Sequence, residues 1–486
     1  MDLGNPFLSL TDTKHETSTQ QRAWYPFYVG VDIGADFHVA ACISIEQFRT
    51  DKAWKRAKTM KFNADSKGIH NFLNALKDIQ IKFGLSPKDF FILLEPTGGH
   101  YSYLLMRVLL NEGYELYQVE NKAVKDFRER QLGITEKSDD IDARIMSYMG
   151  WHKSLHPDMK SVRIVKPATP TQVLFRTLTR DRWLLSTQLT RRKNQVQQLF
   201  AVTHPDLKSG FKKLGTKTVF KLVLKYPTAQ KMALATQHEL RQAIIEVGGK
   251  NIATKASEAL TNALKETLAI TIPHLEDRQT WLIEEAIRIE EAIEKIDQQI
   301  ATLLHGDRER NISPHPYNQI LKTFPVMSDV MACTLIGAIG DVERFSTYLE
   351  FKKYLGVSAE SKTSGTSVSK TRMTYEGIRD TRRILFLMSL LLLAPNTGPT
   401  VFKAHYDRLV ARGMNKRKAI GHVCGKLATV IYSCLKQGVP YDPRLHAKKC
   451  GVEWNEAYEK KMKVKTDIGL FELEADKLAE EPVDIE

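Results

Sequence analysis

Acidic residues end two apolar segments that lie far apart in the chain. Asp32 follows the apolar residues 28–31, and Glu95 follows the apolar residues 91–94. A short apolar run bounded by Gly or Pro predicts a buried strand whose end opens onto a site. Each acid taken alone is better explained as the exposed end of a buried strand.

A third segment contributes two more acids. Asp139 and Asp142 are three residues apart, so a helix would carry both on one face while its next turns bury Ile145, Met146 and Met149. Four carboxylates gathered in one place would form a hard-oxygen site that suits Mg²⁺, with Mn²⁺ as an alternative. The order strand Asp, strand Glu and helical Asp-x-x-Asp therefore predicts a metal-dependent active site.

The elements expected to position these acids alternate between strands and helices. A strand over 38–45 is predicted to form a hairpin with the strand that ends at Asp32. A helix over 69–83 precedes the strand that ends at Glu95. Asp36 and His38 lie close to the site in sequence, and we expect them to support it rather than to bind metal.

The middle of the chain is predicted to form long helices. Apolar residues between 282 and 303 recur at alternating intervals of four and three, which is the heptad seam of a coiled coil. The seam consists of Leu282, Ala286, Ile289, Ile293, Ile296, Ile300 and Leu303. With a helix over 171–200 and a helical insert over 218–264, this pattern predicts an antiparallel arm suited to dimerisation.

The charge favours a polyanionic partner. The 486 residues carry a formal charge of +14, and residues 466–486 alone carry a net −7, which leaves about +21 on the rest. Candidate phosphate contacts lie on the helix over 171–200 and near the start of the apolar stretch 384–395. They are Arg176, Arg180, Arg191, Arg192, Lys370, Arg372, Arg379, Arg382 and Arg383. An ordinary solvated helix face explains the first four equally well.

Several classes of protein are disfavoured by the sequence. The five cysteines have no Cys-x-x-Cys or Cys/His spacing, which predicts reduced thiols and no zinc site. Residues 1–22 are polar and contain no export signal, so we expect a cytoplasmic protein. The apolar stretch 384–395 is too short to span a bilayer and predicts a buried helix, with no membrane partner.

Taken together, the motifs resemble the DEDD transposases of the insertion-sequence one-ten and eleven-eleven group, which includes the Piv-type DNA invertases. The family's strand Asp matches residues 31–34, and its Glu followed by Thr-Gly matches residues 95–98. Its Lys-Thr-Asp-x-x-Asp-Ala motif matches residues 137–143. Its Gly-Leu-Val-Pro…Ser-Gly loop aligns with residues 356–365 and places the family's nucleophilic serine at Ser364.

The resemblance implies an α/β plus α fold class in several parts. Residues 25–165 would form a RuvC-like DEDD domain of ribonuclease H fold, and residues 166–305 a central helical and coiled-coil region with an insert. Residues 306–445 would form a mainly helical C-terminal transposase domain with the serine loop. Residues 1–24 would be flexible, and residues 446–486 a tail that is acidic from about residue 466.

The resemblance also implies a function. Mg²⁺ held by Asp32, Glu95, Asp139 and Asp142 would assist Ser364 in cutting and rejoining DNA through a covalent phosphoserine. The implied partners are the DNA of the element ends and target, a guide-type non-coding RNA, and further copies of the chain in a homodimer or tetramer, acting at the nucleoid of a prokaryote.

Two alternatives remain open. A RuvC-like nuclease or resolvase would use the same acids with water as the nucleophile. A non-catalytic nucleic-acid-binding protein would use the basic helices alone.

Overall fold

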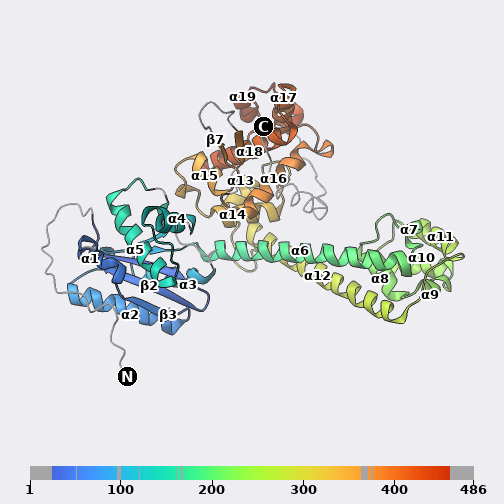
Figure 1. The fold of residues 1–486 in the computed structure, drawn as a ribbon. Helices are drawn as coiled ribbons and strands as arrows, with labels where there is room; N and C mark the ends of the chain where they lie inside the picture. The colour runs from blue at the N-terminus through green and yellow to red at the C-terminus, as the bar shows by residue number, and fades with distance from the viewer. Residues whose placement is uncertain are drawn as a thin grey trace. The chain divides into compact units, whose positions relative to one another are not determined.

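The computed structural model describes most of the chain, namely residues 24–50, 52–95, 100–119, 121–159, 161–165, 168–362, 370–373 and 376–459. The chain divides into two compact units, Met1–Pro167 and Ala168–Glu486 (Figure 1). Each unit, called below the N-terminal unit and the C-terminal unit, has its own hydrophobic core.

A mixed sheet forms the centre of the N-terminal unit. Its six strands lie in the order β3-β2-β1-β4-β5-β6. β1, β4 and β5 are parallel neighbours, whereas β1–β2, β2–β3 and β5–β6 are antiparallel pairs. The hairpin predicted after Asp32 is therefore confirmed. The strands are β1 (Phe27–Ile33), β2 (Phe37–Ser44), β3 (Thr59–Asn63), β4 (Phe90–Leu94), β5 (Leu116–Val119) and β6 (Val162–Ile164).

Helices cover both faces of this sheet. Val29 and Val31 of β1 pack toward α2 and α3 on one face. Tyr28, which alternates with them, packs toward α5 on the other face. The helices are α1 (Ile45–Arg49), α2 (Ser66–Phe83), α3 (His100–Asn111), α4 (Asn121–Asp126) and α5 (Asp139–Leu155), with 3₁₀ turns η1 (Ala53–Arg56) and η2 (Pro87–Asp89) and a π turn η3 (Phe127–Gln131).

The close contact between α5 and β1 depends on a glycine. A Cβ atom at Gly30 would lie 2.1 Å from the carbonyl oxygen of Ala143 in α5, so no larger residue fits there. The N–H of Gly30 donates a hydrogen bond of 2.8 Å to the hydroxyl of Ser147. That hydroxyl in turn donates to the carbonyl of Ala41 in β2. These contacts fix α5 directly over the centre of the sheet.

Two long helices, α6 (Pro170–Thr203) and α12 (Pro273–His305), form the arm of the C-terminal unit (Figure 1). Charged pairs join them in antiparallel register, with Arg182 Nε 2.5 Å from Asp297 Oδ1 and Arg192 Nε 2.8 Å from Glu285 Oε2. Most of the heptad seam is buried, namely Leu282, Ala286, Ile289, Ile293 and Ile300. The antiparallel arm is confirmed, and α6 of the same chain already packs against α12. The heptad pattern therefore does not itself require a second copy of the chain.

A small helical cluster lies between these two helices in the sequence and at the far end of the arm (Figure 1). Phe220, Leu240 and Leu260 are among the side chains of its core. Its helices are α7 (Leu207–Gly210), α8 (Lys217–Lys225), α9 (Ala229–Ala233), α10 (Gln237–Glu246) and α11 (Ala253–Leu264). The sequence predicted this insert only as a helical stretch.

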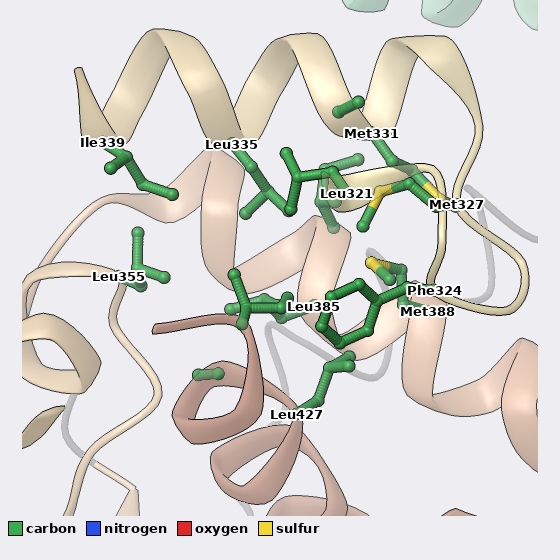
Figure 2. Close-up of a cluster of buried hydrophobic side chains, with 14 of the residues drawn as sticks. Leu321, Phe324, Met327, Met331, Leu335, Ile339, Leu355, Leu385, Met388 and Leu427 are labelled. Carbon is green, nitrogen blue, oxygen red and sulfur yellow. The ribbon is translucent and has the colours of Figure 1, made fainter. Parts of the chain in front are cut away.

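The remaining part of the C-terminal unit is a helical body. Leu335 of α14, Leu385 of α16 and Leu427 of α18 meet in its core (Figure 2). The elements are α13 (Pro316–Leu321), α14 (Asp329–Ile339), α15 (Tyr348–Tyr354), α16 (Arg379–Leu393), α17 (Val401–Ala411), α18 (Lys416–Gln437) and α19 (Pro443–Cys450), with 3₁₀ turns η4 (Val342–Arg344), η5 (Pro395–Thr397) and η6 (Glu456–Glu459) and a hairpin of β7 (Ala359–Lys362) with β8 (Lys370–Met373).

The apolar stretch that begins at Ile384 is a buried helix, as predicted, because it lies in α16. None of the helices in the described ranges combines the length and apolarity needed to cross a bilayer.

The turn between α13 and α14 contains Val326 with a φ of 60°, a left-handed conformation that is unfavourable for a β-branched residue. Val326 is buried there, so packing holds the strained turn in place.

Candidate active site

Asp32 and Glu95 lie next to each other at the carboxyl ends of two neighbouring parallel strands. Val31 of β1 is in register with Leu94 of β4, and Asp32 and Glu95 are the next residues along. The N–H of Glu95 donates to the carbonyl of Val31 at 3.4 Å. Val31 and Leu94 face α2 and α3. Because side chains alternate along a strand, Asp32 is directed to the α5 face.

The other two acids belong to the first turn of α5. Ser138 is the N-cap, and its side chain accepts a hydrogen bond from the N–H of Ile141. This cap starts the helix so that Asp139 and Asp142 both fall in the first turn. Since Gly30 lets α5 approach the sheet, the start of the helix brings these charges within reach of Asp32, whose carboxyl interacts with both.

The electrostatics of Asp32 reflect the other three acids. Burial raises the pKa of Asp32 from its ordinary value of 3.8 to about 7, and a hydrogen bond with Glu95 and the charges of Glu95, Asp139 and Asp142 contribute to the same increase. Like-charged carboxylates this close cannot all ionise without cost. At neutral pH the group therefore favours either a bound proton or a bound cation.

The chemistry of these residues fits a divalent cation. Carboxylate oxygens are hard donors that suit Mg²⁺ or Mn²⁺, and a cation would relieve their mutual repulsion. Among the described residues, which include all four acids, no three His, Cys, Asp or Glu side chains already surround a common point. The acids are thus neighbours whose side chains are not yet gathered around one ion.

One of the four acids, Asp142, is held by an arginine that sequence reasoning missed. Arg128 Nη1 donates to Asp142 Oδ1 at 2.6 Å, and the side chains of Arg128 and Asp142 are only 6% and 13% exposed. Arg128 also bonds Glu129. The sequence offers no means of telling Arg128 from Arg130, since both precede the Asp-x-x-Asp segment at similar spacing.

Asp140, between the two site acids, points elsewhere. It accepts a hydrogen bond from the hydroxyl of Thr59 in β3. His38 is a core residue, because it is buried and its ring packs edge-on against Phe62. Burial lowers the pKa of His38 and favours its neutral form. Neither residue joins the group of four acids.

The predicted nucleophile, Ser364, lies outside the described residues. The hairpin strands β7 and β8 flank residues 363–369 in the sequence, and β8 contains Lys370 and Arg372. Arg379, Arg382 and Arg383 follow at the start of α16. All of these basic residues belong to the C-terminal unit, whereas the four acids belong to the N-terminal unit. Their participation in one site with the acids stays a prediction.

Several arginines proposed to contact nucleic acid have partners inside the C-terminal unit. Arg176 donates to the carbonyl oxygens of Gly337 at 2.7 Å and Ala338 at 3.4 Å. Its guanidinium therefore joins α6 to the end of α14.

Several other arginines of α6 and α16 also have partners inside the C-terminal unit. Arg192 pairs with Glu285, and Arg180 Nε lies 3.8 Å from Asp380 Oδ2. The Arg383 guanidinium stacks over the ring of Trp183 at 4.8 Å from its centroid. Arg191 is exposed on α6. Contact with nucleic acid stays a prediction for these residues, and exposure favours Arg191.

Both units are similar to known protein families. A family model described as a transposase, of the DEDD type of IS110, matches residues 29–205. A second model, described as the transposase IS116/IS110/IS902 family, matches residues 318–407. The first match covers the four acids and all of the sheet except the first two residues of β1, and the second covers much of the helical body.

Individual proteins are also similar. The chain is 25% identical to the "Insertion element IS110 uncharacterized 43.6 kDa protein" of Streptomyces coelicolor over 279 residues, 55% of this chain and 64% of that protein. It is 27% identical to a "Pilin gene-inverting protein" of Moraxella bovis and 26% identical to that of Moraxella lacunata, each over 157 residues, 32% of this chain. The chain spans about half of each Moraxella protein, 47%, and less than two thirds of the Streptomyces protein.

Proposed function

We propose that this chain, which belongs to the IS116/IS110/IS902 family of transposases, is a DNA recombinase that cuts and rejoins strands through a covalent phosphoserine. The observation that carries the proposal is that Asp32 lies beside Glu95 at the ends of β1 and β4 and also interacts with the charges of Asp139 and Asp142 on α5. A non-catalytic binding protein has no need of four mutually repelling acids, which cost stability wherever they are not neutralised.

The N-terminal unit supports a RuvC-like active site of ribonuclease H fold. An antiparallel meander of β1, β2 and β3 followed by the parallel strands β4 and β5 is the arrangement expected of that fold. The acids at the ends of β1 and β4, together with those on α5, occupy the corresponding edge. Asp32, Glu95, Asp139 and Asp142 would hold Mg²⁺, with Mn²⁺ as a substitute.

When bound, the cation would supply Lewis-acid stabilisation of charge at the scissile phosphate. The role of the chain's own residues is to hold that position. β1 and β4 fix Asp32 and Glu95 side by side, and the Ser138 cap fixes the first turn of α5. This framework would hold the backbone of the acids in position before substrate arrives, so that only their side chains need to adjust during reaction.

Ser364 would provide the nucleophile. Its Oγ would attack phosphorus and form a new P–O bond as the bond to the departing strand oxygen breaks, with the serine proton passing to a base or to that oxygen. The phosphoserine keeps the energy of the phosphodiester, so that a strand hydroxyl can later displace the serine and rejoin the DNA. A plain nuclease, which uses water, would release the strand without such an intermediate.

The proposed partners follow from the family and the charge. DNA of the element ends and target would be the substrate, and a guide-type non-coding RNA and further copies of the chain would complete the assembly. The basic body supports a phosphate-rich partner. The reaction would take place in the cytoplasm.

The test is a cleavage reaction on labelled DNA that carries the ends of the element. We expect Mg²⁺-dependent cleavage to leave protein attached to a DNA end after denaturation, because a phosphoserine ester is a covalent bond. Ser364→Ala should abolish both the adduct and rejoining while the protein still folds. Ser361→Ala and Ser367→Ala are the matched controls from the same stretch and should keep both.

The same experiment distinguishes the recombinase from the nuclease and from the non-catalytic binding protein. If Ser364→Ala still cuts DNA in a Mg²⁺-dependent manner and releases free ends, water is the nucleophile and the recombinase proposal is wrong. If neither protein cuts but both bind DNA, the non-catalytic alternative gains support.

A further inference from the structure

Arg128 and Arg130 belong to the same π turn, Phe127–Gln131, but have opposite environments. The side chain of Arg128 is 6% exposed, whereas that of Arg130 is 78% exposed and pairs with Asp126 at 3.6 Å. A π turn inserts a residue into a helical segment and is frequent at functional sites. In this protein one of its two arginines is buried beside the acidic group.

The contacts of Arg128 are concentrated on Asp142. Nη1 donates to Asp142 Oδ1 at 2.6 Å, and Nη2 donates to Glu129 Oε1 at 3.3 Å. Nε is buried and has no hydrogen-bond partner among the described residues. Removing two charges from water offsets much of their attraction, so a buried pair of this kind is a weak source of net stability. Control of where the Asp142 carboxylate points is a better reason for this contact.

The carboxylate of Asp142 has two oxygens, and the ion pair uses one of them. Oδ1 accepts from Arg128, which leaves Oδ2 for another ligand. Residues behind a metal ligand commonly fix its orientation by a hydrogen bond of this type. The backbone supports the same arrangement, because the carbonyl of Arg128 accepts a 2.9 Å hydrogen bond from the N–H of Ile134 in the segment that leads to α5.

We propose that Arg128 is a positioning residue for the divalent cation: it holds Asp142 through Oδ1 and directs the other carboxylate oxygen toward the cation. The proposal rests on the proposed function in one respect, namely that the four acids bind a cation. Arg128 touches neither DNA nor the reacting phosphate in this role. It acts through Asp142 alone.

The test measures Mn²⁺ binding to the full-length protein without DNA, by the electron paramagnetic resonance signal of the unbound ion. Arg128→Gln should raise the Kd for Mn²⁺ by about 10- to 100-fold, the usual effect of losing a partner behind a metal ligand. Arg130→Gln, from the same turn, should leave the Kd unchanged. Arg128→Lys keeps the charge but cannot span both carboxylates, so its Kd should lie between those of the unchanged protein and Arg128→Gln.

Each other outcome overturns the assignment. A folded Arg128→Gln protein that binds Mn²⁺ as tightly as the unchanged protein shows that Asp142 needs no positioning. Tighter binding shows that the guanidinium competes with the cation. If Arg128→Gln does not fold, Arg128→Lys decides, and a Kd equal to that of the unchanged protein is then the contrary result. Unfolding of both variants would assign Arg128 to folding alone.

Failure of the proposed function gives a different pattern. If the unchanged protein shows no saturable Mn²⁺ binding, the four acids are not a metal site, and this proposal falls with that function. If the unchanged protein binds Mn²⁺ and the Arg128 variants do not differ from it, only the role of Arg128 is wrong.

Discussion

The hydroxyl of Thr59 in β3 donates a hydrogen bond to the carboxylate of Asp140 at the start of α5. This contact directs Asp140 to the edge of the sheet, whereas Asp139 and Asp142 add their charges to the environment of Asp32. Three acids of one helical turn therefore have two different roles. The separation follows from helix geometry, since residues one apart point in different directions while residues three apart share a face.

Neutralising the site acids should abolish strand cleavage. We expect Asp32→Asn, Glu95→Gln, Asp139→Asn and Asp142→Asn each to eliminate Mg²⁺-dependent cutting of labelled element-end DNA, because each removes a charged oxygen donor. DNA binding in a mobility-shift assay should remain. Asp140→Asn is the matched control, because an amide oxygen can still accept from Thr59. Equal loss at Asp140 and Asp139 would contradict a register of α5 in which only Asp139 and Asp142 face the site.

The raised pKa of Asp32 predicts how stability depends on pH. Its folded-state pKa, about 7, lies above its ordinary value of 3.8, so the folded protein binds more protons than the unfolded chain between these limits. The contribution of Asp32 to stability is therefore present below about pH 4 and lost as the pH rises through 7. In urea unfolding with EDTA, the free energy of unfolding of Asp32→Asn should increase relative to that of the unchanged protein as the pH rises from about 4 to about 7.

A divalent cation provides the control for this pH effect. Because a cation neutralises the carboxylates without a proton, Mn²⁺ should abolish most of the difference between Asp32→Asn and the unchanged protein near pH 7, or reverse it. A difference that does not vary between about pH 4 and 7 would mean that Asp32 titrates normally in the folded protein.

The arm should depend on its buried seam even in a single chain. Ile293→Asp places a charge in the interface of α6 and α12, and we expect it to lower the free energy of unfolding by about 3–5 kcal/mol, as for an uncompensated buried charge. Urea unfolding followed by circular dichroism measures this loss. Gln298→Asp adds the same charge at an exposed position of α12 and should have little effect. Light scattering on both variants shows separately whether the oligomer depends on the seam.

Two arginines of α6 should behave differently when replaced. Arg176→Met removes the donors that bind the carbonyls of Gly337 and Ala338, so it should lower the free energy of unfolding by about 1.5–3 kcal/mol. Arg191→Gln should leave stability unchanged and reduce by about one the slope of log K against log salt for duplex DNA, if Arg191 contacts a phosphate. An unchanged slope would restrict nucleic-acid contact to other basic residues.

Local patterns in the sequence were sufficient to predict the elements that carry the acids. The apolar runs before Asp32 and Glu95 are strands, and Asp139 and Asp142 lie in one helical turn. These elements were predictable because the side-chain periodicity of a strand or a helix is visible within a few neighbouring residues. The antiparallel arm was also predictable from the heptad and the helices on either side of the insert. The serine loop stays a prediction based on the family.

Only the tertiary structure decided which elements meet. The pairing of β1 with β4, which brings Asp32 beside Glu95, joins segments separated by β2, β3, α1 and α2, and no local spacing specifies it. The seam of α12 is covered by α6 because packing accepts any complementary apolar face, from the same chain or from another. Arg128 and Arg130 are alike in the sequence, and the π turn alone buries one beside Asp142 and leaves the other in solvent. Residue type and spacing thus determined the chemistry available to this protein, whereas long-range packing decided which charges face one another.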